Sequence, residues 1–86
     1  MTALQPELDL GTIRKYVSHD LLGGREIAGD ENLLLSGLLD SLSVMSLVSF
    51  IEKTSSLSIP FEDVIIENFE TLDAIDEYLT KQITNG

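Results

Sequence analysis

The amino-acid sequence predicts an all-α protein, a small three-to-four-helix bundle. Two observations support this fold class. Apolar residues recur at spacings of three and four in three separate segments, which is the period of one face of a helix. Glycine, serine and proline clusters separate these segments. The 86 residues, 43% of them hydrophobic, suffice for one small folded domain. We therefore expect a single domain over residues 1–86, with residues 1–7 frayed.

The first predicted helix runs from Leu8 to Leu22. Its apolar face consists of Leu10, Ile13, Val17 and Leu21. Gly23 and Gly24 end it, because paired glycines continue a helix poorly and suit its C-terminal cap. Residues 25–39 then predict a long ordered loop, attached to the core by Leu33 and Leu38. Loops of this length in a small domain are often functional.

The second predicted helix begins at Asp40 or Ser41 and ends near Thr54, before a cluster of serines and Pro60. Its buried stripe consists of Val44, Leu47, Val48 and Ile51. Leu42 and Met45 lie on a flank of that stripe.

A short helical turn is expected around Asp63 to Asn68, followed by a last helix. Thr71 is its predicted N-cap, and Asp73 in the first turn favours the positive end of the helix dipole. The apolar stripe of this helix consists of Leu72, Ile75, Leu79 and Ile83. The sum is a bundle of three main helices with a short extra one.

The charge of the chain limits the partners it can have. Fifteen acidic and five basic residues give a formal net charge of −10. Nucleic acids and anionic membranes repel such a surface, so we expect neither as a partner, and basic docking patches are favoured instead. Seven of the acidic residues fall between Thr54 and Thr80, where there is no Lys or Arg. A solvated face is the expected reading of that stretch.

The residue types present also exclude several kinds of site. There is no cysteine, and His19 is the one histidine, so thiolate and multi-histidine metal sites are excluded. We expect His19 to be solvated near the end of the first helix. The N-terminus lacks the pattern of a signal peptide, and no apolar run is long enough to span a bilayer. These features predict a soluble, cytoplasmic protein, with monomer as the default state.

Ser41 by itself is a weak signal, since a serine beside an aspartate at a helix start usually belongs to the cap. A nucleophilic serine needs a base and an oxyanion site. His19 is the base on offer, and Ser41 lacks the Gly-x-Ser-x-Gly surroundings of a hydrolase elbow. We therefore set aside a serine hydrolase.

The surroundings of Ser41 carry more information. The segment Gly37-Leu38-Leu39-Asp40-Ser41-Leu42 resembles the attachment motif of acyl and peptidyl carrier proteins. The resemblance continues in Ile59-Pro60, in Asp63-Val64 and in the block from Asn68 to Ile75. It covers about Leu33 to Leu79 with the spacing of that family.

This resemblance implies a covalent carrier rather than an enzyme. Ser41 would be the hydroxyl to which a phosphopantetheinyl transferase attaches the 4′-phosphopantetheine of coenzyme A. A phosphodiester there would meet unsatisfied N–H groups and the helix dipole. Asp40 would help the transferase and its Mg²⁺ hold the site. The arm would carry an acyl or aminoacyl group as a thioester between a loading enzyme and a downstream synthase or transferase.

Leu42 and Met45 match positions where the family presents apolar contacts to partner enzymes; the alternative is that both belong to the core. Two departures from the family pattern stand out. Serines at 43, 46 and 49 replace the acidic face typical of fatty-acid carriers, with Glu52 offset by Lys53. Docking should therefore depend less on charge. In addition, Ser55 stands where relatives commonly have a buried aromatic residue.

The Leu-Leu-Asp-Ser-Leu form is most similar to stand-alone carriers of specialised pathways, of polyketide or nonribosomal peptide type. Two competing functions are kept for an experiment to discriminate, the second of them disfavoured by the surroundings of Ser41. One is an acidic helical interaction module that is never modified, and the other is a small hydrolase that uses Ser41.

Overall fold

The computed structural model describes residues 10–55 and 57–85. Its elements are α1 (Leu10–Lys15), the π-helix η1 (Tyr16–Leu21), α2 (Ser41–Ser55), the 3₁₀ turn η2 (Phe61–Asp63), α3 (Ile66–Phe69) and α4 (Leu72–Asn85). This order confirms the all-α class. The residues expected to fray, 1–7, lie outside the described part of the chain.

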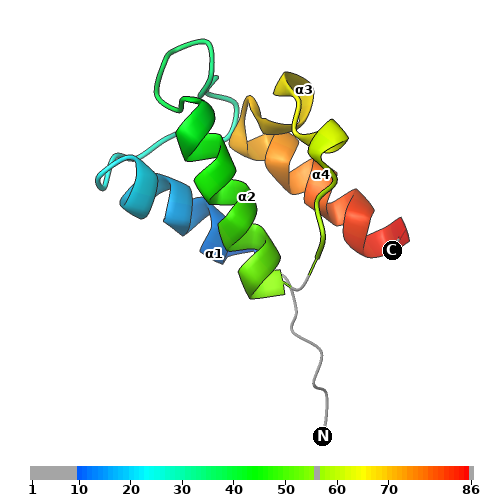
Figure 1. Cartoon of the computed structure of the whole chain (residues 1–86). Helices are drawn as coiled ribbons and strands as arrows, with labels where there is room; N and C mark the ends of the chain where they lie inside the picture. Colours follow the sequence, from blue (N-terminus) through cyan, green and yellow to red (C-terminus); the bar gives the residue numbers. More distant parts are fainter. Residues whose placement is uncertain (1–9, 56, 86) are drawn as a thin grey trace, which may run out of the picture.

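A long loop and a returning connection place the elements around α2. The loop arches from the end of η1 to the start of α2, and the chain after α2 runs back along α4 to reach η2 and α3 (Figure 1). α3 packs on α4, and η1 contacts α2. Residues that follow α2 in sequence thus return toward its first turn. None of the helices in the described residues is long and apolar enough to cross a bilayer.

The apolar stripes of the three main helices meet in one core. The side chains that are almost completely buried are Ile13, Val17, Leu33, Leu47, Ile51, Phe69, Ile75 and Leu79. The predicted stripe of α4 was one residue too long, because Ile83 is 50% exposed. Apolar spacing identifies the face of a helix but not the point where the neighbouring elements end.

The first helix differs from a regular α-helix over its second half. The chain widens into a π-helix at Tyr16, and the N–H of Leu22 donates to the carbonyl of Val17, five residues earlier, at 3.0 Å. Gly23 and Gly24 then adopt positive φ angles of 67° and 94°, as expected for a glycine stop. The predicted end of the helix is confirmed, whereas nothing in the apolar spacing predicts the π-helix.

The loop over residues 25–39 is attached to the core by Leu33 and Leu38, as predicted, and more firmly by Leu39, which the prediction left out. Leu33 is fully buried and Leu39 is 2% exposed, whereas Leu38 is only partly buried. The N–H of Leu33 donates to the carbonyl of Glu70 at 2.7 Å, and the N–H of Asp73 donates to the carbonyl of Gly29 at 3.0 Å. These bonds hold the loop against the start of α4.

The predicted short helix at 63–68 is in fact two pieces, η2 and α3, which lie on either side of Val64 and Ile65. The last helix begins as expected, because the Thr71 hydroxyl accepts a hydrogen bond from the N–H of Ala74 at 2.9 Å. Ser55, at the position of the missing aromatic residue, is buried, and its hydroxyl donates to the carbonyl of Ile51.

The acidic stretch between Thr54 and Thr80 is not a uniformly solvated face. Asp76 accepts hydrogen bonds from Arg14 Nε at 3.1 Å and Nη2 at 2.7 Å, which join α1 to α4. Asp63 and Glu70 also accept hydrogen bonds from side chains distant in sequence. The exposed carboxylates of the stretch belong to Glu62, Glu67, Asp73 and Glu77.

Candidate functional site

Ser41 is the first residue of the fifteen-residue helix α2, and its side chain is exposed. Its position depends on the loop before it. Gly37 adopts a positive φ of 81°, which turns the chain, and the N–H of Leu39 donates to the carbonyl of Leu33 at 2.9 Å. Leu33 and Leu39 are both buried, so the end of the loop is held in place. The side chain of Ser41, just after it, faces solvent.

Asp40 is the N-cap of α2. Its Oδ1 accepts a hydrogen bond from the N–H of Ser43 at 2.8 Å, and its carbonyl accepts from the N–H of Val44 at 3.0 Å. The bond from Ser43 holds the pKa of the Asp40 carboxyl below its usual value. The expectation that the N–H groups of this first turn are unsatisfied is therefore wrong for Ser43, whose N–H is taken by Asp40.

A groove of about 590 Å³ lies beside Ser41. Its near wall comes from the loop and α2, and its far wall comes from the chain around η2 and α3. The lining residues are Leu34, Leu39, Asp40, Ser41, Val44 and Met45 on the near side, and Phe61, Val64, Ile65, Ile66 and Phe69 on the far side. Apart from Asp40 and Ser41 these side chains are apolar, so the groove offers an apolar surface next to an exposed hydroxyl.

The far wall was missed by reasoning from the sequence. Phe61 is 81% exposed, Ile66 58% and Ile65 47%, which is unusual for large apolar side chains. A signal was present in the sequence, since Val64, Ile65 and Ile66 form an apolar run within the otherwise acidic stretch, with Phe61 three residues before it. Only the return of the chain toward α2 brings them next to Ser41.

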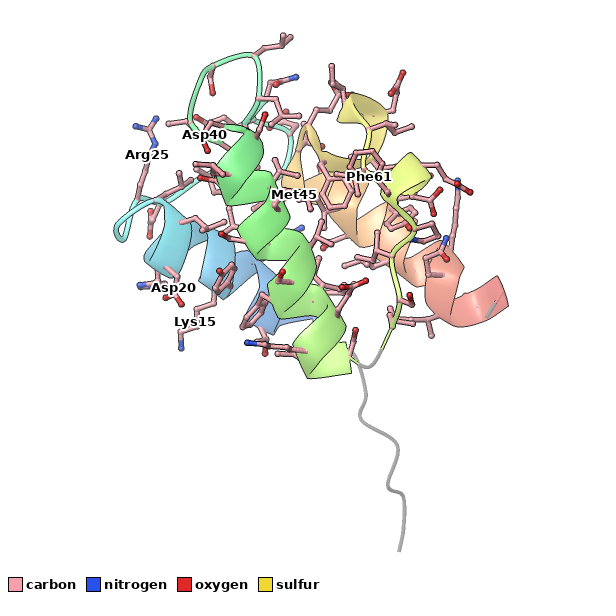
Figure 2. All side chains as sticks on the ribbon, viewed as in Figure 1. Lys15, Asp20, Arg25, Asp40, Met45 and Phe61 are labelled. Atoms are coloured by element: carbon pink, nitrogen blue, oxygen red, sulfur yellow. The ribbon has the colours of Figure 1, made fainter. Side chains whose placement is uncertain are left out.

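The two predicted partner-contact residues have different surroundings. Leu42 is 78% exposed, so the core alternative is wrong for it. Met45 is 43% exposed and lines the groove, opposite Phe61 (Figure 2). Both side chains are thus accessible near Ser41, Leu42 for the most part and Met45 for less than half of its surface.

His19 lies on η1 and is exposed, as expected, and it is not among the residues that line the groove. The charged group of the lining is Asp40, whose lowered pKa makes it a weak base. This geometry presents an exposed hydroxyl, and the residues that line the groove include no strong base beside it.

The chain matches a known protein family over most of its length. Residues 11–79 match the family described as phosphopantetheine attachment site. The chain belongs to this family. Its members bind 4′-phosphopantetheine as a prosthetic group and are generally non-catalytic carriers. The motif around Ser41, the groove and the helical core of this carrier all fall within the matched residues. No curated protein sequence matches the chain significantly.

Proposed function

We propose that Ser41 is the residue that carries the 4′-phosphopantetheine arm. The observation that supports this most directly is the exposed Ser41 hydroxyl at the start of α2, inside the family match. Its neighbours on the first turn do not cover it, and the loop before it is held by two buried leucines. A transferase can therefore approach the hydroxyl without rearranging the fold.

The chain's part in the modification is to supply the nucleophile. Ser41 Oγ forms a new bond to the phosphorus of coenzyme A that bears the pantetheine. The bond from that phosphorus to the bridging pyrophosphate oxygen breaks, adenosine 3′,5′-bisphosphate leaves, and the hydroxyl proton passes to a base of the transferase. When bound, the arm supplies a terminal thiol that holds an acyl or aminoacyl group as a thioester. The carrier needs no general base of its own for this.

Asp40 supports the site in two ways. Its hydrogen bond with Ser43 holds the first turn of α2 and so the position of Ser41. Its exposed carboxylate is ionised at neutral pH, as for an ordinary aspartate, and the lowered pKa extends this form to lower pH. The ionised carboxylate is the form that binds a hard cation such as the Mg²⁺ of the transferase. The Asp40 carboxylate would lie close to the negatively charged phosphodiester on Ser41 and would repel it. Asp40 therefore helps the transferase and its metal to bind, and does not stabilise the modified carrier.

We propose that partner enzymes dock on Leu42 and Met45, with Phe61 as a third apolar contact across the groove. Leu42 and Phe61 are the more exposed of the three, and Met45 is less than half exposed. Ser46 and Ser49, two further exposed serines of α2, add no charge beside them. Docking on this face depends on apolar burial more than on ion pairs.

The function we propose is that of a monomeric, non-catalytic carrier, which moves acyl or aminoacyl groups between enzymes of a biosynthetic pathway. Its partners are the phosphopantetheinyl transferase, a loading enzyme and a downstream synthase or transferase. The polyketide or nonribosomal peptide type of pathway rests on the Leu-Leu-Asp-Ser-Leu form of the motif. The stand-alone character and the cytoplasmic location stay predictions.

The test is the intact mass of the protein after incubation with coenzyme A and a broad-specificity phosphopantetheinyl transferase. Wild type should gain the mass of one phosphopantetheine, and Ser41→Ala should gain none. The matched controls are Ser43→Ala and Ser46→Ala, which alter neighbouring serines of α2 and should be modified like wild type. Modification of Ser41→Ala would move the site to another residue. An unmodified wild type that reacts with an active-site serine probe would instead favour the hydrolase.

A further inference from the structure

The far wall of the groove is a segment with few attachments to the core. We call residues 61–66, from Phe61 to Ile66, the 61–66 segment. It lies between two buried anchors, Ile59 at 7% exposure and Phe69 at 1%. Within the segment, Val64 is partly buried against the core, whereas Phe61, Ile65 and Ile66 are exposed. Apolar burial alone therefore holds this wall weakly.

One hydrogen bond ties the segment to α4. The hydroxyl of Tyr78 donates to Asp63 Oδ2 at 2.6 Å. In the described part of the chain, the other hydrogen bonds of the segment join residues at most five positions apart, such as that from Asn68 Nδ2 to the carbonyl of Asp63 at 2.8 Å. These local bonds shape the segment but do not attach it to α2 or α4.

Tyr78 is a rigid partner for this bond. Its ring is buried, with 7% exposure, and packs against Phe69 with 6.0 Å between ring centroids. Phe69 itself lines the groove. The Tyr78 hydroxyl is thus held at a fixed place in the core, and Asp63 must lie against it for the bond to form. A tyrosine hydroxyl is protonated at neutral pH even at its ordinary pKa, and burial together with this hydrogen bond raises the pKa of Tyr78 further.

We propose that the hydrogen bond between Tyr78 and Asp63 is a latch that positions the 61–66 segment and thereby shapes the apolar groove beside Ser41. The latch acts through Phe61, Val64 and Ile65, which form much of the far wall. With the latch closed, the wall stands opposite Met45 and presents one defined docking surface. With it open, the segment moves about its anchors at Ile59 and Phe69. Tyr78 and Asp63 are positioning residues, and their effect on docking rests on the function proposed for Ser41.

Hydrogen exchange tests the latch on the unmodified protein. Tyr78→Phe removes the donor but keeps the ring, and Asp63→Ala removes the acceptor. In both variants the amides of Val64 and Ile65 should exchange about tenfold faster or more, as expected for a lost hydrogen bond to a charged group. Core amides at Leu47 and Leu79 should keep their rates. Asp63→Asn retains an acceptor oxygen and should restore most of the protection, and the double variant should exchange no faster than either single one.

Tyr16→Phe is the matched control, because Tyr16 stacks on Phe50 at 4.0 Å and does not line the groove. It should leave the exchange of the 61–66 segment unchanged. Faster exchange of all amides together in Tyr78→Phe, or no change at Val64 and Ile65, would overturn the latch and leave Tyr78 as an ordinary core residue.

A second experiment tests whether the latch affects the docking of a partner enzyme. The kcat/KM of the phosphopantetheinyl transferase should fall by about threefold or more in Tyr78→Phe, a change of roughly 0.7 kcal/mol, and stay unchanged in Tyr16→Phe. An unchanged kcat/KM despite faster exchange of the segment would refute the influence of the latch on the site. If Ser41→Ala were still modified, the proposed attachment site would fail, whereas the exchange result would be unaffected.

Discussion

Asp40 Oδ1 accepts a hydrogen bond from the backbone N–H of Ser43 at 2.8 Å. Asp40 therefore caps the helix, and the neighbouring Ser41 is free to present its hydroxyl to solvent. Asp40 satisfies an N–H group of the first turn, so the Ser41 hydroxyl is not needed as a cap. Ser41 is left exposed at the first position of α2, available for modification at little expected cost to stability.

The first prediction concerns the stability of variants at these two positions. Ser41→Ala should change the free energy of unfolding by less than about 0.5 kcal/mol, because its side chain is exposed and does not cap the helix. Asp40→Ala should lower the melting temperature clearly, since it leaves the N–H of Ser43 without its partner. Thermal and urea unfolding of both variants check this. A larger loss in Ser41→Ala than in Asp40→Ala would mean that Ser41 is the cap.

The second prediction follows from the lowered pKa of Asp40. A carboxyl whose pKa is lower in the folded than in the unfolded state stabilises the fold above its unfolded pKa, and this contribution is lost as the pH falls through the folded pKa. Wild type should therefore be more stable than Asp40→Asn at pH 7, and the difference should shrink below about pH 4. Urea unfolding of both proteins at several pH values measures it. A difference that does not vary with pH would contradict the role of the ionised carboxylate.

The third prediction compares two leucines of α2. Leu47 is fully buried, whereas Leu42 is 78% exposed. Leu47→Ala should destabilise the protein by about 2–5 kcal/mol through lost burial and the cavity left behind. Leu42→Ala should cost less than about 0.5 kcal/mol. Urea denaturation curves give both values, and similar losses for the two variants would show that the buried face of α2 is placed wrongly.

The fourth prediction concerns how partner enzymes recognise the carrier. If docking depends on apolar contact, Met45→Asp should lower the kcat/KM of the cognate loading enzyme about tenfold or more, because it removes apolar burial and adds a carboxylate that must lose water. Added salt should matter less, since it screens charges over about 10 Å at 0.1 M but hardly weakens apolar burial.

Ser46→Asp is the control for that experiment. It places the same charge one residue away, on an exposed side chain that does not line the groove. It should reduce kcat/KM far less than Met45→Asp does. If salt abolishes the reaction while Met45→Asp is tolerated, docking is electrostatic, and the acidic stretch from Glu62 to Glu77 becomes the recognition face.

Much of the helical framework could be predicted from local patterns. The stripes through Val17, Leu47 and Ile75 identify buried faces because helical spacing puts such residues on one side. The start of α2 could be predicted because an aspartate before an apolar stripe is a typical cap. The local sequence therefore suffices to place Ser41 at the start of α2.

The errors fall where contacts between distant residues decide the outcome. Leu38 and Leu39 are chemically alike and both contact the core, but Leu39, which the prediction left out, is the one that is buried. Ile83 continues the spacing of α4 but stays half exposed. In both cases the local sequence allows either arrangement, and packing against other elements selects one.

The sequence by itself determined that this protein is an all-α carrier with an exposed serine at the start of its second long helix, because capping, apolar spacing and the family motif all lie within short stretches of chain. The tertiary structure decided what surrounds that serine. Phe61, Val64 and Ile65 face Met45 across the groove, and Asp63 meets Tyr78 on α4. These relationships join residues fifteen or more positions apart, so they arise only when the chain after α2 folds back and the shared core fixes both partners.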